Sequence, residues 1–283
     1  MQRVHAPPGP DEKVTALARE LVAGGPATNA AVTVAVLGGD VRLVTAVGSG
    51  GLASIVREDL DRFGLSVLDV AAGDRDFSLN VSSVVVVEGT GERSVVSMDG
   101  GTVDDPSAAL AARASMADTG ADVVLLDGHY PAVALAVAAE ARTRRTPVVL
   151  DAGRWKPHFV DLLPLVDDVV CSAAFTVPAA SAFGDIASFG HAAGARVVAQ
   201  TNGAGAIQLS VEGRLTTVDV PSVEAVDTLG AGDALHGAYA FHRASGREPE
   251  VALRRAAEVA SFRCRFVGSR TWVHNWMDAW SDR

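Results

Sequence analysis

Asp227-Thr228-Leu229-Gly230-Ala231-Gly232-Asp233 is the most informative stretch of this chain. The residues after it are apolar at helical spacing, so the glycines end a loop and Asp233 lies in the first turn of a helix. The amides of Gly230, Ala231 and Gly232 can surround phosphate oxygens, helped by the helix dipole and by the close approach that glycine allows. Asp233 can accept the proton of an attacking hydroxyl. The stretch therefore predicts a phosphoryl-transfer site.

A plainer interpretation of the same stretch is open. Asp233 would then be only a charge that favours the helix start, and the glycines an ordinary tight turn. For an isolated Gly-x-Gly-Asp this interpretation is the better one, but the full string favours a phosphoryl-transfer site.

The string resembles the C-terminal signature of the ribokinase-like (PfkB) carbohydrate kinases, in which the aspartate is the base and the preceding backbone forms the anion hole. A second match is Gly24-Gly25-Pro26-Ala27-Thr28-Asn29-Ala30-Ala31, which resembles the family's N-terminal Gly-Gly and Asn pattern. Two motifs in the expected order are more specific than either one. The resemblance runs from roughly Gly24 to Gly268. Within the family, the chain most resembles the ketohexokinase-like members.

Bulk properties predict a single ribokinase-like domain over residues 1–283, because a chain of this length with 48% hydrophobic residues can bury a large core. The net charge of −10 argues against a nucleic-acid or anionic-membrane surface. Lys13 and Lys156 are the only lysines, and no Walker-type string is present. Cys171 and Cys264 form no framework, so we expect free thiols and a cytoplasmic protein without a signal peptide or membrane span.

The order of apolar runs predicts an α/β fold. Runs typical of buried strands at residues 123–126, 148–150 and 169–171 alternate with helical stretches at 131–143 and 161–166. Such a pattern is typical of a central, mainly parallel sheet covered by helices on both faces, which gives three layers. The resemblance implies the same ribokinase-like fold. Ligands should gather at the C-terminal ends of the strands.

One segment differs from this pattern. Residues 77–87 and 93–98 flank Glu88-Gly89-Thr90-Gly91-Glu92 and alternate in part, which predicts an antiparallel hairpin at about 77–100. The resemblance implies a small β lid over the sugar that often meets the lid of a second subunit, so we expect a homodimer. The alternative is an edge hairpin of the core sheet.

The resemblance also implies the sugar site. Gly25 and Asn29 would contact sugar hydroxyls, and Asp127, at a strand end, would bind another hydroxyl. Arg93, after the hairpin turn, would reach the transferred phosphate. The alternatives are a helix-cap asparagine, a turn aspartate before glycine and a solvent-facing strand arginine.

The nucleotide side is expected in two segments. The residues that the resemblance assigns to it are Thr201, Gly203, Gly205, Ala260, Cys264 and Gly268. The first three could equally form a plain hairpin turn. Asp227 and nearby carbonyls could hold a monovalent cation such as K⁺, as in several relatives, or Asp227 could cap the following loop.

Two departures from the family pattern stand out. Residues 1–10 contain three prolines and no apolar run, so the family's first strand, with an aspartate that grips the sugar, is expected to be absent. We hypothesise that the natural N-terminus is longer. Ser172 and Phe175 occupy the places of an Asn-x-x-Glu that organises Mg²⁺ and ATP in many relatives. Mg²⁺ would then be held mostly by ATP phosphates and water.

These observations predict an ATP-dependent kinase that phosphorylates a hydroxyl of a small sugar or sugar-like polyol, with Asp233 as the general base. A nucleoside kinase of the same fold is one alternative, although the chain has few aromatic residues to hold a base. A non-catalytic sugar- or nucleotide-binding protein is another. A dehydrogenase is disfavoured because no Gly-x-Gly-x-x-Gly follows an N-terminal strand. The sequence does not name the sugar.

Overall fold

The computed structural model describes residues 1–98, 103, 105–178, 180 and 182–280. Its largest sheet has six strands in the order β12-β11-β10-β9-β8-β7. They are β7 Val124–Leu126, β8 Val148–Ala152, β9 Asp168–Cys171, β10 Val197–Asn202, β11 Gly205–Val211 and β12 Arg214–Val218. Strands β7 to β10 run parallel, whereas β11 and β12 are each antiparallel to the preceding strand. The prediction of a central, mainly parallel sheet is confirmed.

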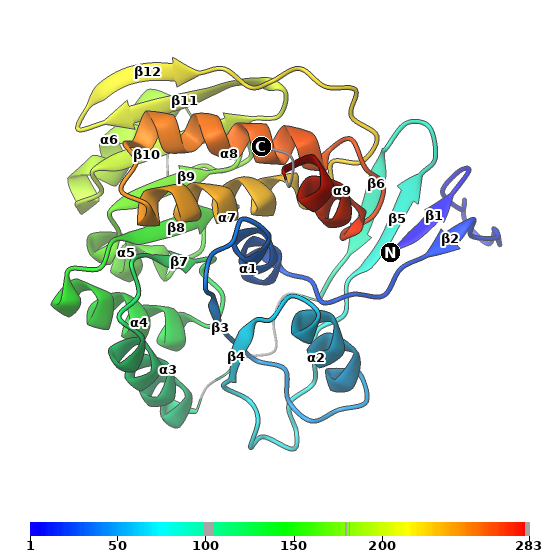
Figure 1. Cartoon of the computed structure of the whole chain (residues 1–283), viewed down its shortest axis with the longest axis horizontal. Coiled ribbons are helices and arrows are strands. Elements are labelled where there is room, and N and C mark those ends of the chain that lie inside the picture. The colour runs from blue at the N-terminus through cyan, green and yellow to red at the C-terminus, as the bar shows by residue number, and fades with distance from the viewer. Residues whose placement is uncertain (99–102, 104, 179, 181, 281–283) are drawn as a thin grey trace.

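Helices cover both faces of this sheet (Figure 1). One layer contains α1 Pro26–Val36, α7 Ala231–Ala244, α8 Pro249–Arg263 and α9 Thr271–Trp280, and the other contains α3 Pro106–Thr119, α4 Pro131–Arg144, α5 Phe159–Leu162, the 3₁₀ helix η1 Leu163–Leu165 and α6 Phe183–Ala193. Strand residues alternate between the two cores: Val149 packs with the first layer, and Val148 and Leu150 with the second. This alternation follows from the two-residue period of a strand, and it makes three layers.

A second, parallel pair of strands lies beside α1. It consists of β3 Arg42–Thr45 and β4 Ser66–Asp69, joined through α2 Ala53–Asp61. Leu43 of β3 and Leu60 of α2 are buried in the same core as α1 and α7. Val44 of β3 packs against the other core, so the pair alternates between the two cores as the central strands do.

The residues expected to form a lid lie in a separate four-stranded sheet in the order β2-β1-β5-β6 that projects to one side (Figure 1). We refer to this sheet as the lid. Its strands are β1 Gln2–Val4, β2 Ala18–Arg19, β5 Ser83–Val87 and β6 Arg93–Val96. The hairpin β5–β6 is thus not an edge hairpin of the core sheet, and that alternative is wrong. Residues 99 and 100 of the expected lid lie outside the described residues.

The N-terminal residues belong to the lid and not to the six-stranded sheet. Residues 2–4 do form a strand, but it pairs with β5 and β2 in the lid. In the part of the chain that the structure describes, the six-stranded sheet takes no strand from residues before 124. Across these same described residues, no helix has the length and apolar character needed to cross a membrane.

Candidate active site

The signature stretch forms a loop that turns into α7 at Gly230. Gly230 has φ +76°, a left-handed conformation that glycine adopts without strain, and it caps the helix. Asp233 lies in the first turn, where the helix dipole favours a carboxylate. Gly232 is exposed. The amide of Ala231 donates to the carbonyl oxygen of Thr228 at 3.2 Å. The helix start therefore presents backbone amides beside a carboxylate.

Asn29 and Asp233 form the central contact of the site. Nδ2 of Asn29 donates to Oδ2 of Asp233 at 2.7 Å, although the two residues are 204 positions apart. A Cβ atom on Gly230 would lie 3.8 Å from that Nδ2 and 3.7 Å from that Oδ2, so the loop rests against the pair. Among the described residues no donor contacts Oδ1 of Asp233. One carboxylate oxygen is thus held in place, and the other remains for a ligand.

Two glycines allow α1 to bring Asn29 to this place. Gly25 precedes α1 with φ +100°, a conformation that other residues rarely adopt. Gly237 lies where α7 crosses α1, and a Cβ there would collide with the carbonyl oxygen of Ala30. The backbones of the two helices can therefore approach closely, which sets the Asn29 amide against the start of α7.

Arg270 fixes the orientation of the Asn29 amide. Its Nη1 donates to Oδ1 of Asn29 at 3.0 Å, and its Nη2 donates to Oδ2 of Asp59 at 3.2 Å and to the carbonyl oxygen of Ala23 at 2.8 Å. A guanidinium only donates hydrogen bonds, so the amide oxygen must face it and the amide NH₂ must face Asp233. Asp59 and Arg270 are nearly buried. Through Asn29, this chain of contacts fixes the side chain of Asp233, the proposed base.

Asp127 follows β7, at the C-terminal end of the strand as predicted. Its Oδ2 accepts from the amide of Ala27 at 3.1 Å, and its Oδ1 accepts from the amide of His129 at 2.9 Å. The carboxylate therefore does what a turn aspartate does, and it also ties the start of α1 to the sheet. Each oxygen keeps a second lone pair for a ligand.

A buried pair, Asp151 and His236, lies beneath the same edge of the sheet. Nε2 of His236 donates to the carbonyl oxygen of Val170 at 3.1 Å, and its Nδ1 faces Oδ2 of Asp151 at 3.2 Å. Among the described residues, this Nδ1 has no hydrogen-bond partner. Burial is the main cause that raises the pKa of Asp151 to about 6. The charges of Asp233 and Asp127 also raise this pKa, and the charge of His236 lowers it. The charges of the proposed site therefore act on the buried carboxyl group of Asp151.

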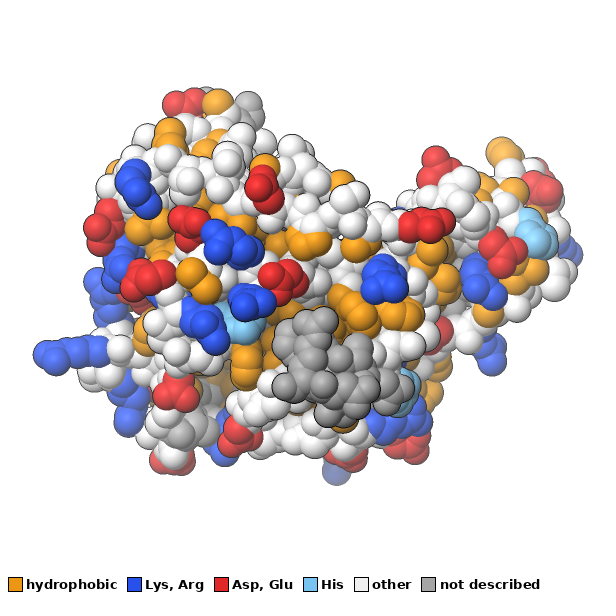
Figure 2. Space-filling view, turned by 45° about the horizontal axis from the view of Figure 1, so that its top comes forward, with side chains coloured by type: hydrophobic (Ala, Val, Ile, Leu, Met, Phe, Trp, Pro, Cys, Tyr) orange, Lys and Arg blue, Asp and Glu red, His pale blue; other side chains and the backbone are white. Residues whose placement is uncertain are grey.

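Arg93 links the lid to the signature loop. Its Nη1 donates to Oγ1 of Thr228 at 2.6 Å. A pocket of about 790 Å³ opens here, between the lid and the loop. Its lining residues are Pro7, Val85, Val87, Thr90, Gly91, Glu92, Arg93, Ser94, Ala225, Val226, Asp227 and Thr228. Figure 2 shows that the surface is hollowed between the main body and the projecting lid.

The predicted nucleotide segment at residues 201–205 forms the turn between β10 and β11. Oγ1 of Thr201 donates to the carbonyl oxygen of Cys171 at 3.3 Å, which joins the turn to the end of β9. Gly203 has φ +56°, and a Cβ on Gly205 would crowd the side chain of Asn202. The turn therefore lies at the same C-terminal edge as Asp127, and its described hydrogen bonds run to β9 rather than to α7.

The second segment predicted to bind the nucleotide meets the signature loop directly. The carbonyl oxygen of Cys264 accepts from the amides of Val226 and Asp227, at 2.8 and 3.2 Å, and the amide of Gly268 donates to Oδ2 of Asp227 at 2.9 Å. Ala260 lies one turn earlier in α8, and its carbonyl oxygen accepts from the amide of Cys264. Residues 260–268 and the loop before α7 are therefore one packed unit.

The carboxylate of Asp227 is buried, and its oxygens are already in use. Oδ1 accepts from the amide of Leu229 at 2.8 Å, which is the loop cap that we considered as the alternative to a cation. Nη1 of Arg263 donates to the carbonyl oxygen of Asp227 at 2.6 Å, and Nη2 lies 3.7 Å from its Oδ2. A guanidinium thus stands where the monovalent cation was expected, and a metal ion does not fit beside it.

The substitutions at the magnesium motif have structural roles. Oγ of Ser172 donates to the carbonyl oxygen of Gly153 at 2.6 Å. Phe175 is buried against Trp155 and Phe159. In the described part of the chain no group of three or more His, Cys, Asp or Glu side chains could hold a metal ion. Phe175 has no ligand atom to offer a magnesium ion, and the hydroxyl of Ser172 is already engaged by Gly153.

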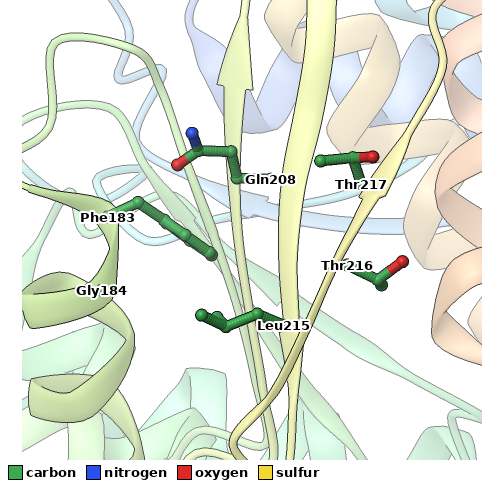
Figure 3. A pocket seen from close by; sticks show the side chains of 6 residues that line it. All are labelled: Phe183, Gly184, Gln208, Leu215, Thr216 and Thr217. Carbon is green, nitrogen blue, oxygen red and sulfur yellow. The ribbon is translucent and has the colours of Figure 1, made fainter.

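A second hollow, of about 570 Å³, lies at the outer edge of the six-stranded sheet. Figure 3 shows its lining from α6 (Phe183, Gly184), β11 (Gln208) and β12 (Leu215, Thr216, Thr217). No residue that the sequence assigned to sugar, phosphate or nucleotide belongs to this lining, and none of the six is charged. The hollow lies apart from the chemistry described above.

Sequence reasoning missed Arg263, Arg270, Asp151 and His236. Arg270 immediately precedes α9, where a cation opposes the helix dipole. Such an arginine needs an acidic partner, which was the one available signal. Arg263 and the Asp151–His236 pair carry no comparable signal, because their partners come from distant segments.

Three comparisons with known proteins bear on the family and the fold of this chain. The model of the pfkB family carbohydrate kinase matches residues 1–275. A ribokinase of Bacillus subtilis (strain 168) is 26% identical over 269 residues, which cover 90% of this chain and 85% of that protein.

Solved structures agree with the fold. A protein from Agrobacterium tumefaciens, provisionally described as a ribokinase, has a TM-score of 0.79 and 25% identity, covering 100% of this chain and 94% of its own. An Arabidopsis thaliana ribokinase solved with ribose and ATP has a TM-score of 0.72 and 20% identity, covering 98% and 94%. The ribokinase-like fold predicted from the sequence is therefore confirmed.

Proposed function

The chain belongs to the pfkB family of carbohydrate kinases, and from this membership we propose that it transfers the γ-phosphoryl group of ATP to a hydroxyl of a small sugar or sugar-like polyol. The observation that carries the proposal is the hydrogen bond between Asn29 and Asp233 at the start of α7. It joins the two family motifs in one site, with a carboxylate beside the amides of the helix start.

Asp233 acts as the general base in this proposal. Its Oδ2 is held by Asn29 at 2.7 Å, so Oδ1 accepts the hydrogen bond of the acceptor hydroxyl. The proton passes to Oδ1 as the hydroxyl oxygen bonds to the γ-phosphorus and the bond to the β-phosphate oxygen breaks. An aspartate is a weak base, with an unperturbed pKa of about 3.9. Most of the acceleration therefore comes from positioning and charge stabilisation.

The transferring group is stabilised by the start of α7. The amides of Gly230, Ala231 and Gly232 point at phosphate oxygens, and the helix dipole adds to their effect. The Ala231 amide exchanges its turn bond to Thr228 for a phosphate oxygen in this proposal. Arg93, which holds Thr228 in this structure, supplies a charge-assisted hydrogen bond to the same group.

The remaining ligands follow from the expected site. Gly25, Asn29 and Asp127 orient the sugar, and Thr201, Gly203, Gly205, Ala260, Cys264 and Gly268 wall the nucleotide. When bound with ATP, Mg²⁺ neutralises charge on the phosphates. The free thiols of Cys171 and Cys264 fit the cytoplasm that we propose as the location of the enzyme.

We also propose a homodimer through the lid. Val95, Val96 and Met98 follow one another on or beside the outermost strand of the lid, and each is at least half exposed, at 50%, 74% and 73%. An apolar edge strand is stabilised by pairing with a second copy. Val96→Arg should shift the sedimentation coefficient from dimer to monomer, whereas a monomeric unaltered protein would contradict the proposal.

The test is ATP consumption by the purified protein with Mg²⁺ across ketoses, aldoses, sugar acids and nucleosides. A sugar or polyol that stimulates turnover in the unaltered protein, but not in Asp233→Asn, supports the proposal. Stimulation by nucleosides alone would replace it by a nucleoside kinase. ATP and sugar binding without turnover would indicate a binding protein.

A further inference from the structure

Arg263, the last residue of α8, carries one of the largest fully buried side chains among the described residues, with 1% of its surface exposed. A buried charge is costly unless oxygen atoms surround it. Nη1 donates to the carbonyl oxygens of Asp227 at 2.6 Å and Phe266 at 3.3 Å, and Nη2 donates to that of Gly268 at 3.3 Å. The guanidinium therefore lies in a ring of backbone oxygens.

A carboxylate completes this ring. Oδ2 of Asp227 lies 3.7 Å from Nη2 of Arg263. Three carbonyl oxygens and one carboxylate are the type of oxygen set that binds a hard monovalent cation. The same oxygens cannot hold a metal cation while the guanidinium occupies them, because two positive charges would then share one buried space.

The ring holds both halves of the site. Asp227 begins the loop that leads to Gly230 and the start of α7, and its carboxylate also accepts from the amides of Leu229 and Gly268. Two residues after Gly268, Arg270 reaches Asn29. The charge of Arg263 thus fixes the anion-binding loop on one side and the support of the base on the other.

We propose that Arg263 is a built-in cation that does the work of a bound monovalent ion, so that turnover needs no added K⁺. Arg263 is a positioning residue, because it contacts the loop and not the substrate. Its place at the C-terminus of α8 strengthens this role, since the negative end of the helix dipole favours a cation there. The effect on turnover rests on the proposed function, but the effect on the loop does not.

The experiment compares the unaltered protein with Arg263→Met in buffers that contain either K⁺ or tetramethylammonium, an ion too large for the ring. Acceptor-dependent kcat and KM, and the midpoint of thermal unfolding (Tm), are measured in each. For the unaltered protein we expect the two buffers to give kcat values within twofold of each other and Tm values within about 1 °C. Arg263→Met leaves the oxygens without a cation, so K⁺ should raise its Tm and restore kcat at least tenfold, as should millimolar guanidinium. Arg254→Met, on an exposed face of the same helix, should behave like the unaltered protein.

Two results would overturn the proposal: activation or stabilisation of the unaltered protein by K⁺, or an Arg263→Met variant with unchanged kcat and no response to K⁺. Should Arg263→Met fail to fold, the comparison of the unaltered protein in the two buffers decides by itself. Should no acceptor be turned over, the proposed function fails, and the Tm measurements still test the built-in cation.

Discussion

Replacing Asn29 with aspartate would set a second carboxylate against the proposed base. In the structure, Nδ2 of Asn29 lies 2.7 Å from Oδ2 of Asp233, so Asn29→Asp exchanges a hydrogen-bond donor for a negative charge at almost the same position. Two carboxylates this close share a proton, because both cannot ionise together at low cost. The base would then be blocked until that proton leaves.

The size of the effect follows from the distances. Two unit charges about 4 Å apart repel by about 4 kcal/mol at an effective dielectric constant of about 20, which corresponds to about 3 pH units. The guanidinium of Arg270, 3.0 Å from Oδ1 of Asn29, offsets part of this repulsion. We therefore expect the acid limb of the activity profile to move upward by roughly 1–2 pH units.

The assay is kcat/KM for the best acceptor from pH 5 to 9. The sign is fixed by the mechanism: Asn29→Asp should be slow at low pH and recover as the shared proton leaves at high pH, whereas Asn29→Ala should be slow throughout. Asn275→Asp makes the same chemical change on the exposed side of α9 and serves as the control. An unmoved acid limb in Asn29→Asp would refute the contact between Asn29 and the working base.

Three further predictions concern the support of the site. Arg270→Met frees the Asn29 amide to rotate, so kcat should fall by about 10- to 100-fold while KM for ATP changes little, as steady-state kinetics would show. Asp151→Asn removes a carboxylate whose folded-state pKa is raised from 3.8 to about 6; the stability that Asp151 contributes is present below pH 4 and is lost through pH 6, by up to about 3 kcal/mol. As the pH rises from 4 to 7, the free energy of unfolding of the variant in urea should therefore increase relative to that of the unaltered protein. Gly237→Ala forces a methyl group against the backbone of α1 and should cost about 1–3 kcal/mol in urea unfolding at neutral pH.

Contrary results are equally specific. An Arg270→Met variant that loses only ATP affinity would show that Arg270 does not position the base. A constant stability difference between Asp151→Asn and the unaltered protein at pH 4 and 7 would mean that Asp151 does not hold a raised pKa. A fully stable Gly237→Ala would show that α1 and α7 are not in close backbone contact.

The sequence predicted the parts of the fold that local patterns determine. The runs at 148–150 and 169–171 are strands because buried parallel strands need unbroken apolar stretches. The loop before α7 ends at Gly230 because the backbone there requires a left-handed residue. Lid strands β1 and β2 were not expected, since short strands carry little pattern of their own. They gain stability from pairing, β1 with β5 and β2 with β1.

The sequence predicted individual residues of the site but not the contacts between them. Asp233 and Asn29 each stand out in a motif, but the contact between them arises from the packing of α1 on α7, which no local pattern shows. Asp227 was expected to face a cation, and the structure places the guanidinium of Arg263 there. A charge that comes from a distant helix cannot be told from a surface arginine by its neighbours in the sequence.

The central claim is that Asp233 takes the proton of a sugar hydroxyl during transfer of the γ-phosphoryl group. Its most direct test is the rate of transfer of labelled γ-phosphate from ATP to the best acceptor, measured with the affinity for ATP in the unaltered protein and in Asp233→Asn. We predict a labelled sugar phosphate from the unaltered protein, a rate lower by about 10²- to 10⁴-fold in the variant, and an unchanged ATP affinity. Equal rates of transfer in the two proteins would contradict the account.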